Sequence, residues 1–349
     1  MKQAQPTQTE WRKLFDVAAR VKELAPWEWM MEDEVFGVQD DEAGVTGFVS
    51  VMGAGGEHFA IALYPDPAAL YAFLDLHDQG MEEEADDPQA AMRVLELPQM
   101  QVAFEDNQEL EKEDKALIKQ LGLKFRGAKA WPQFRSFTPG LFPWRLTGAE
   151  ARRLTVALGQ VLEVAPRCRD DEEMFAPSED GTVFLVRVPK EQGGWADQIL
   201  KIEEPEPAPL HFEVDPQAFA QAKELRRVTN VIEIELTMLP MPVKDKKIER
   251  PYFPYALILA EAQSGAIVAN EMLQPLPSLD AMYGTVPQLL LGTFLRLGVL
   301  PELLRARNPL LAELLAPLAE ELNFKVDTVR KLPAIDAFME GMGRMMQMF

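Results

Sequence analysis

Apolar residues recur at helical spacing in several parts of this chain. In the stretch 10–24, Trp11, Leu14 and Ala18 follow one another at intervals of three or four residues, which predicts a helix. Thr147, with Glu150 three positions later, predicts a capping box at the start of another helix. The spacing predicts further helices at residues 67–77, 107–121, 148–164, 217–226, 279–297 and 309–322, and one at the C-terminus.

Shorter apolar runs between these helices have the length and composition of β-strands. They lie at residues 35–39, 47–52, 58–64, 99–104, 182–188, 231–239, 255–261, 266–272, 303–307 and 325–329. Glycine-containing stretches such as DDEAG, GAGGE and QSG join several of them, and such stretches favour hairpin turns. The pattern therefore predicts an α/β (α+β) protein.

The predicted elements fall into two halves with the same order along the chain: strand, strand, strand, helix, strand, helix, strand, helix. Between the halves, residues 190–216 are rich in proline and acids, most clearly at EEPEPAP. Such a composition resists regular structure and predicts a domain boundary. We therefore expect an N-terminal α/β domain over residues 1–204 and a C-terminal α/β domain over residues 205–349.

The order of elements resembles that of the ribonuclease H-like fold, in which three antiparallel strands precede alternating helices and strands. A resemblance of topology implies no function. Residues 107–124 and 308–325 align without a gap and share one asparagine, three leucines and one lysine. Leucines on helices match by chance, so duplication of one unit and coincidence between two α/β units both stay open.

Composition and charge limit the classes of protein to consider. The formal net charge of -21 opposes general adhesion to nucleic acid or anionic lipid. The single cysteine, Cys168, excludes an internal disulfide and fits a reducing compartment. The N-terminus lacks the apolar core of a signal peptide, and Arg296 and Pro301 interrupt the longest apolar stretch. We expect a cytoplasmic protein without membrane contact.

Residues 115–149 contain no aspartate or glutamate, although the chain as a whole is strongly acidic. Five bases of this stretch lie within residues 123–146, which we call the basic-aromatic segment. Six large aromatic side chains accompany them: Phe125, Trp131, Phe134, Phe137, Phe142 and Trp144. Three prolines exclude a continuous helix, so we predict a strand followed by an ordered loop.

Two interpretations of the basic-aromatic segment stay open. Arginines bind phosphate or carboxylate in a bidentate manner and tryptophan rings stack on bases, which favours an anion-binding site. Alternatively, the aromatic rings fill the core while the bases neutralise the acidic loops at residues 81–87 and 169–180. The predicted ligand-binding residues are Lys124, Arg126, Lys129, Trp131, Arg135, Trp144 and Arg145.

A divergent metal-dependent nuclease or phosphotransfer hydrolase is the alternative function. A ribonuclease H-like nuclease holds two metals with carboxylates from its strands and its last helix. In the second half, Glu233, Glu235, Asp336 and Glu340 lie on suitable elements, but the fourth strand ends near Arg307, whose charge would repel a metal. We therefore predict neither a metal site nor a cofactor.

No other catalytic constellation is evident in the sequence. The three histidines are scattered without metal-ligand spacing, and Cys168 stands alone in a charged stretch. The GAGG stretch at residues 53–56 precedes a strand, which favours a hairpin over a phosphate loop. The methionine-rich C-terminal helix presents Ile335, Phe338 and Met342 on one face, either to its own core or to a partner.

Several motifs resemble a widespread bacterial family of uncharacterised two-domain proteins. In the first half these are PWEWM, FGVQ, VSVMG and above all KFRGAKAWPQFRSFTPGLFPW at residues 124–144. In the second half they are RPYFPYALILAEAQSG, LPELLRARNPLLAELLAPLAEEL and RKLPAID. The resemblance implies two domains of unknown function. Some relatives carry a cysteine-rich zinc-binding C-terminal tail, which this sequence lacks.

Taken together, these patterns favour a binding or adaptor role over catalysis. The expected partner is an anionic ligand that contacts the basic-aromatic segment: a nucleotide, a nucleic acid or an acidic protein segment. The sequence leaves the identity of the ligand and the oligomeric state open.

Overall fold

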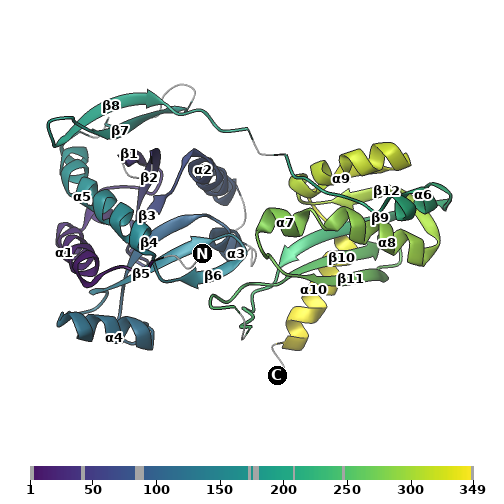
Figure 1. Ribbon diagram of the computed structural model, residues 1–349, viewed down its shortest axis with the longest axis horizontal. Coiled ribbons are helices and arrows are strands. Elements are labelled where there is room, and N and C mark those ends of the chain that lie inside the picture. Colours follow the sequence, from purple (N-terminus) through teal and green to yellow (C-terminus); the bar gives the residue numbers. More distant parts are fainter. Residues whose placement is uncertain are drawn as a thin grey trace. The chain divides into compact units, whose positions relative to one another are not determined.

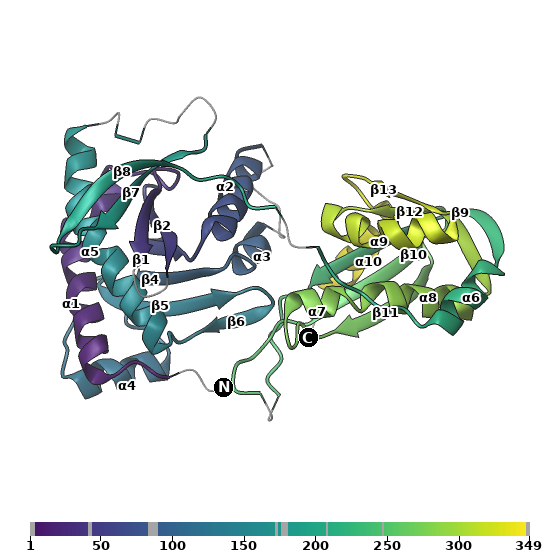
Figure 2. The same ribbon diagram turned by 45° about the horizontal axis from the view of Figure 1, so that its top comes forward.

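The computed structural model describes residues 4–40, 44–82, 90–171, 174–175, 181–206, 209–245 and 248–346. The chain divides into two units, one of residues 1–139 and 143–206 and the other of residues 140–142 and 207–349. Figure 1 and Figure 2 show the helices and strands of each. The mixture of helices and sheets confirms the predicted α/β class.

The larger sheet has eight strands. They are β1 (Phe36–Asp40), β2 (Val45–Met52), β3 (Ala60–Tyr64), β4 (Gln99–Glu105), β5 (Trp131–Thr138), β6 (Leu141–Trp144), β7 (Val183–Pro189) and β8 (Trp195–Lys201). Their order is β6-β5-β4-β3-β2-β1-β7-β8. Neighbours from β1 to β5 are antiparallel and so are β7 and β8, whereas β1 and β7 run parallel.

Helices cover both faces of this sheet. They are α1 (Gln8–Leu24), α2 (Pro67–Glu82), α3 (Ala90–Leu95), α4 (Lys112–Leu121) and α5 (Gly148–Asp170), with a 3-10 turn η1 at Pro26–Glu28. Val51, Ile61 and Val102 pack in the same core as α1 and α5, which lie side by side (Figure 1). Phe48 and Tyr64 pack with α2 in a separate core. Successive residues of a strand point to opposite faces, so burial of both faces fixes the register.

The second unit contains the five-stranded sheet. Its strands are β9 (Arg226–Met238), β10 (Tyr255–Glu261), β11 (Ile267–Leu273), β12 (Val299–Ala306) and β13 (Lys325–Thr328), in the order β11-β10-β9-β12-β13. β9, β10 and β11 are antiparallel, while β12 is parallel to both β9 and β13. The helices are α6 (Pro216–Lys223), α7 (Leu279–Tyr283), α8 (Val286–Leu297), α9 (Pro309–Leu322) and α10 (Pro333–Met346).

The C-terminal helix α10 packs on its own sheet. Ile335 is buried with Ile258 and Ala260 of β10, and Phe338 and Met339 pack against the same cluster. Ile335, Phe338 and Met339 of this face therefore close the core of their own unit. Met345 and Phe349, which follow Met342 at the same helical spacing in the sequence, have side chains outside the described residues.

The two units share the order of elements as far as β5 and β13, but the first unit adds β6 before α5 and β7 and β8 after it. The shared strands also differ in pairing. In the first, the strand after the helical connection, β4, lies beside β3, whereas in the second the corresponding strand, β12, lies beside β9. A helical connection can return the chain to either side of a sheet, so element order does not determine pairing. The ribonuclease H-like assignment stays a prediction.

None of the helices that the structure describes combines the length and the apolar character needed to cross a bilayer.

Candidate functional site

The basic-aromatic segment forms a loop followed by a hairpin. Gly122 ends α4 in the left-handed conformation (φ 70°), and Gly140 (φ 75°) forms the turn between β5 and β6. The sequence predicted an ordered loop after the first strand, and the structure has the strand β6 there instead. Pro143 lies in β6, the last strand in the order of the larger sheet, and prolines within sheets occur mainly in such edge strands.

Arg135 is held inside the unit by acids of α4 and its N-cap. Its two terminal nitrogens donate to the two carboxylate oxygens of Asp114 at 2.9 and 2.7 Å, and Glu111 lies 3.3 Å away. Although burial disfavours its charge, these carboxylates hold the pKa of Arg135 above its ordinary value. Only 8% of the residue is exposed, so this guanidinium belongs to the scaffold.

Lys129, two residues before β5, is also held by carboxylates. Its Nζ donates to Glu109 at 2.9 Å and to Glu105 at 3.0 Å, and its backbone N–H donates to Asp106. The hydrogen bonds to Glu109 and Glu105 raise the pKa of Lys129 above its ordinary value, while Lys129 helps to lower the pKa of Glu109 to about 2.

Four cations gather around a hollow beside α4, which we call the basic hollow. Lys115 and Lys119 come from α4, one helical turn apart, and Lys124 and Arg126 come from the loop that follows. In the part of the chain that the structure describes, no carboxylate pairs with any of the four. The hollow has a volume of about 520 Å³, and Ile118, Phe125 and Trp131 are among its apolar lining residues.

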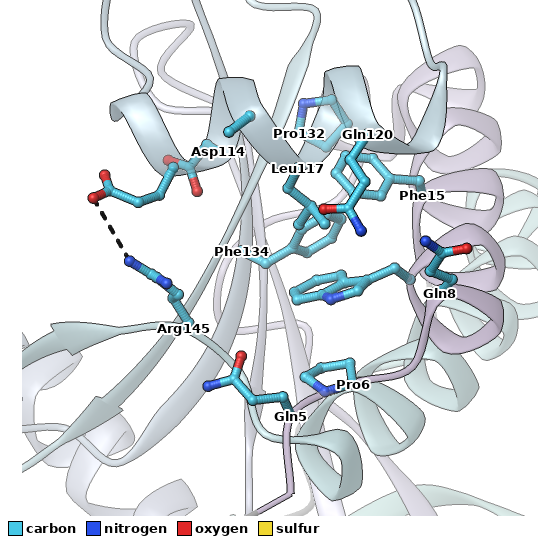
Figure 3. A pocket seen from close by; sticks show the side chains of 13 residues that line it. Gln5, Pro6, Gln8, Phe15, Asp114, Leu117, Gln120, Pro132, Phe134 and Arg145 are labelled. Carbon is cyan, nitrogen blue, oxygen red and sulfur yellow. Dashed lines mark ion pairs between the residues drawn. The ribbon is translucent and has the colours of Figure 1, made fainter. Parts of the chain in front are cut away.

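A second pocket lies on another side of α4, and we call it the aromatic pocket (Figure 3). Trp11, Phe15 and Phe134 are among its lining residues, with ring centroids of Phe15 and Phe134 only 4.9 Å apart. Arg145 reaches its rim and pairs with Glu113 at 3.7 Å. The pocket has a volume of about 360 Å³.

The structure thus distributes the seven predicted ligand-binding residues over three environments. Lys124, Arg126 and Trp131 line the basic hollow. Arg145 lines the aromatic pocket and lies over the ring of the half-buried Trp144. Lys129 and Arg135 are in ion pairs.

Sequence reasoning did not include Lys115 and Lys119 among the ligand-binding residues, although their spacing of four on a predicted helix places both on one face. The acidic loops at residues 81–87 and 169–180 were proposed to neutralise the bases of the basic-aromatic segment. Most of these loop residues lie outside the described ranges, since 83–89, 172–173 and 176–180 are not described. The acids that pair with Lys129, Arg135 and Arg145 in the structure come instead from residues 105–114.

In the second unit, two of the carboxylates considered for metal binding, Glu235 and Asp336, flank a guanidinium. Arg307 pairs with Glu235 at 3.4 Å on one side and with Asp336 of α10 on the other. Burial, offset only in part by Arg307, raises the pKa of Glu235 to about 7. Glu233 is buried and accepts hydrogen bonds from the backbone N–H groups of Ala334 and Ile335 at 2.9 and 3.1 Å. Among the described residues, no group of three potential ligands could hold a metal ion.

The single cysteine is buried in α5. Burial and the nearby Glu34 and Asp171 raise the pKa of the Cys168 thiol to about 11, so the reactive thiolate is disfavoured.

Residues 11–187 match the domain of unknown function DUF7309, and residues 218–343 match the domain of unknown function DUF6930. The chain belongs to the DUF7309 family. This confirms the resemblance to a family of two-domain proteins without an assigned function. The basic hollow lies within the DUF7309 domain, and the cluster around Arg307 lies within the DUF6930 domain. No curated protein matches the chain.

Proposed function

We propose that this protein binds a nucleotide at the basic hollow. The observation that carries the proposal is the group of four cations, Lys115, Lys119, Lys124 and Arg126, without carboxylate partners in the described part of a chain whose net charge is -21. Where acids are within reach, bases of this segment pair with them, as Arg135 does. Four like charges at one hollow repel one another, and an anion between them removes that repulsion.

The lining of the hollow supports a ligand that is both charged and aromatic. Lysines act as mobile point charges toward phosphate, and Arg126 adds a planar donor set. Phe125 and Trp131 are half-buried, with ring centroids 5.8 Å apart, and supply apolar surface for a base. A long polyanion would also meet the field of the acidic chain, so a compact nucleotide fits better than an extended nucleic acid.

The dipole of α4 also favours lysines at the end of this helix, whether or not a ligand binds. Cations near the C-terminus of a helix favourably complement its dipole, and Lys119 lies in the last turn of α4. Lys124 and Arg126 lie beyond the end of the helix, where this effect falls off, and they are exposed. The dipole therefore accounts for only part of the group.

We propose binding rather than catalysis. The nuclease alternative would require Glu235 and Asp336 to hold a metal, and both face the guanidinium of Arg307. A metal ion would have to displace this internal cation.

Isothermal titration with ATP, AMP, pyrophosphate and a short single-stranded oligonucleotide tests the proposal. The double variant Lys119→Ala/Arg126→Ala should bind ATP at least about tenfold more weakly than the unaltered protein, since it loses two charge-assisted contacts. The matched control is Lys223→Ala/Arg296→Ala, which removes one lysine and one arginine from exposed ion pairs of the second unit. Absence of nucleotide binding, or equal binding by both variants, would refute the proposal.

A further inference from the structure

The aromatic pocket has an apolar floor large enough for a side chain of a small ligand. Trp11 and Phe134 have ring centroids 5.8 Å apart, and Pro6, Leu117 and Pro132 extend the apolar surface. Pockets that bind small molecules have this character, with a few polar groups placed on an apolar lining. A volume of about 360 Å³ is at the small end of the range for such pockets.

Three side-chain amides stand around this floor. Gln5 and Gln8 come from the N-terminal segment and the start of α1, and Gln120 comes from α4. In Figure 3, Gln8 and Gln120 lie across the aromatic rings from Arg145. None of the three amides has a side-chain hydrogen-bond partner in the described residues. They are available to a ligand that both donates and accepts hydrogen bonds.

The rim of the aromatic pocket carries one acid and one base that form a weak ion pair. Glu113 and Arg145 are 3.7 Å apart, and their side chains are 55% and 45% exposed, so their mutual attraction is weak. Asp114, the other acid of the lining, is already bound by Arg135 at 2.7 Å. Arg145 is oriented by its position over the Trp144 ring. One carboxylate and one guanidinium, only weakly paired, therefore face a ligand.

We infer that the aromatic pocket binds a free amino acid with a large apolar side chain. The ligand carboxylate forms an ion pair with the guanidinium of Arg145, and the ligand ammonium forms one with the carboxylate of Glu113. The apolar side chain of the ligand packs on Trp11 and Phe134. The weak pair between Glu113 and Arg145 is thereby exchanged for two ion pairs. This ligand is zwitterionic and has no net charge, which matches one acid and one base at the rim.

The two pockets therefore differ in the ligands that they select. The basic hollow presents four cations, and the aromatic pocket presents one weakly paired acid with one base. A nucleotide with several negative charges would meet Glu113 at the aromatic pocket and be disfavoured there. This inference is independent of nucleotide binding at the basic hollow.

Isothermal titration with L-phenylalanine, L-leucine and L-serine tests the inference, together with N-acetylphenylalanine and phenylalaninamide. Phenylalanine should bind, serine should not, and each blocked derivative should bind at least about tenfold more weakly, because it lacks one charge. Glu113→Gln should abolish the preference for phenylalanine over the N-acetyl derivative. Arg145→Met should likewise abolish the preference over the amide.

Two control variants establish that phenylalanine binds at the aromatic pocket and not elsewhere on the chain. Arg296→Met removes a comparably exposed arginine of the second unit and should leave phenylalanine binding unchanged. The hollow variant Lys119→Ala/Arg126→Ala should also retain it, whatever its effect on nucleotides. The inference is overturned if no apolar amino acid binds saturably, or if the rim variants discriminate between the free and blocked ligands as the unaltered protein does.

Discussion

At the scale of single residues, the partners of a base decide its role. Arg135 and Arg126 have the same chemistry and are nine positions apart, yet one is buried against Asp114 and the other is exposed at a hollow. Strand alternation could predict that Phe134 points to the core, as it does. It could not predict the partner of Arg135, because Asp114 lies on another element and approaches only through folding.

The bidentate contact makes Arg135 sensitive to a change that keeps its charge. Arg135→Lys should lower the free energy of unfolding of the first unit by roughly 1–2 kcal/mol, because lysine cannot donate two parallel bonds to Asp114. Tryptophan fluorescence during urea unfolding reports on this unit, since all six tryptophans lie between residues 11 and 195. The exposed Arg126→Lys should change stability by less than about 0.5 kcal/mol. Equal effects of the two substitutions would contradict this prediction.

Glu235 gives the second unit a dependence on pH. Burial raises its pKa from the ordinary 4.5 to about 7, so between these values the native state keeps a proton that the unfolded chain releases. The stability of the second unit should fall as the pH rises through this window and become level above about pH 7. Hydrogen exchange of β9 and β10 measures it.

Glu235→Gln provides the control for this pH dependence. The amide is close in shape and does not titrate, so the variant should lose the slope between pH 4.5 and about 7. If the variant and the unaltered protein showed the same slope, the proton would have to bind elsewhere.

At the scale of elements, strong amphipathic patterns were predictive and weak ones were not. The capping box of Thr147 and Glu150 is present as predicted, and α5 begins at Gly148. The strand β8 lies within the stretch 190–216, which was predicted to be a linker. It was missed because most of its residues are exposed and its sequence, WADQILK, lacks a regular apolar alternation. The edge strand β6 was missed because its proline argued against a strand.

The position of α10 depends on one buried carboxylate. Glu233 accepts the backbone N–H groups of Ala334 and Ile335 at the start of this helix. Glu233→Ala should leave both donors without an acceptor and lower the stability of the second unit by about 2 kcal/mol. Hydrogen exchange in residues 333–342 should increase sharply, whereas Glu233→Gln, which keeps an acceptor oxygen, should show a smaller increase. Unchanged exchange in the alanine variant would show that packing alone holds α10.

At the scale of the whole molecule, the proline- and acid-rich stretch predicts a boundary between two domains. We propose that each domain folds on its own in solution. Glu203, Glu204 and Glu206 are exposed within the proline- and acid-rich stretch. A glutamate-specific protease should cut there first and release two fragments that keep their secondary structure by circular dichroism. Resistance of this stretch while other sites are cleaved, or loss of structure on cleavage, would contradict the two-domain organisation.

The candidate sites could be predicted from the sequence only in outline. The acid-free stretch at residues 115–149 indicated where cations gather, and the basic hollow lies mainly within it. The aromatic pocket joins Gln5 and Trp11 to residues more than a hundred positions later, such as Phe134 and Arg145. Such a site depends on how α1 and β5 pack, which local patterns do not specify.

We propose above all that the unpaired bases of the basic hollow bind a ligand, while the buried and paired Arg135 holds the fold. The ATP dissociation constant and the melting temperature of Arg126→Ala and Arg135→Ala, measured in one series, separate these two roles. Arg126→Ala should weaken ATP binding about tenfold with an unchanged melting temperature, and Arg135→Ala should lower the melting temperature while the folded protein keeps its affinity. The opposite pattern, with Arg135→Ala losing affinity and Arg126→Ala losing stability, would contradict this division of roles.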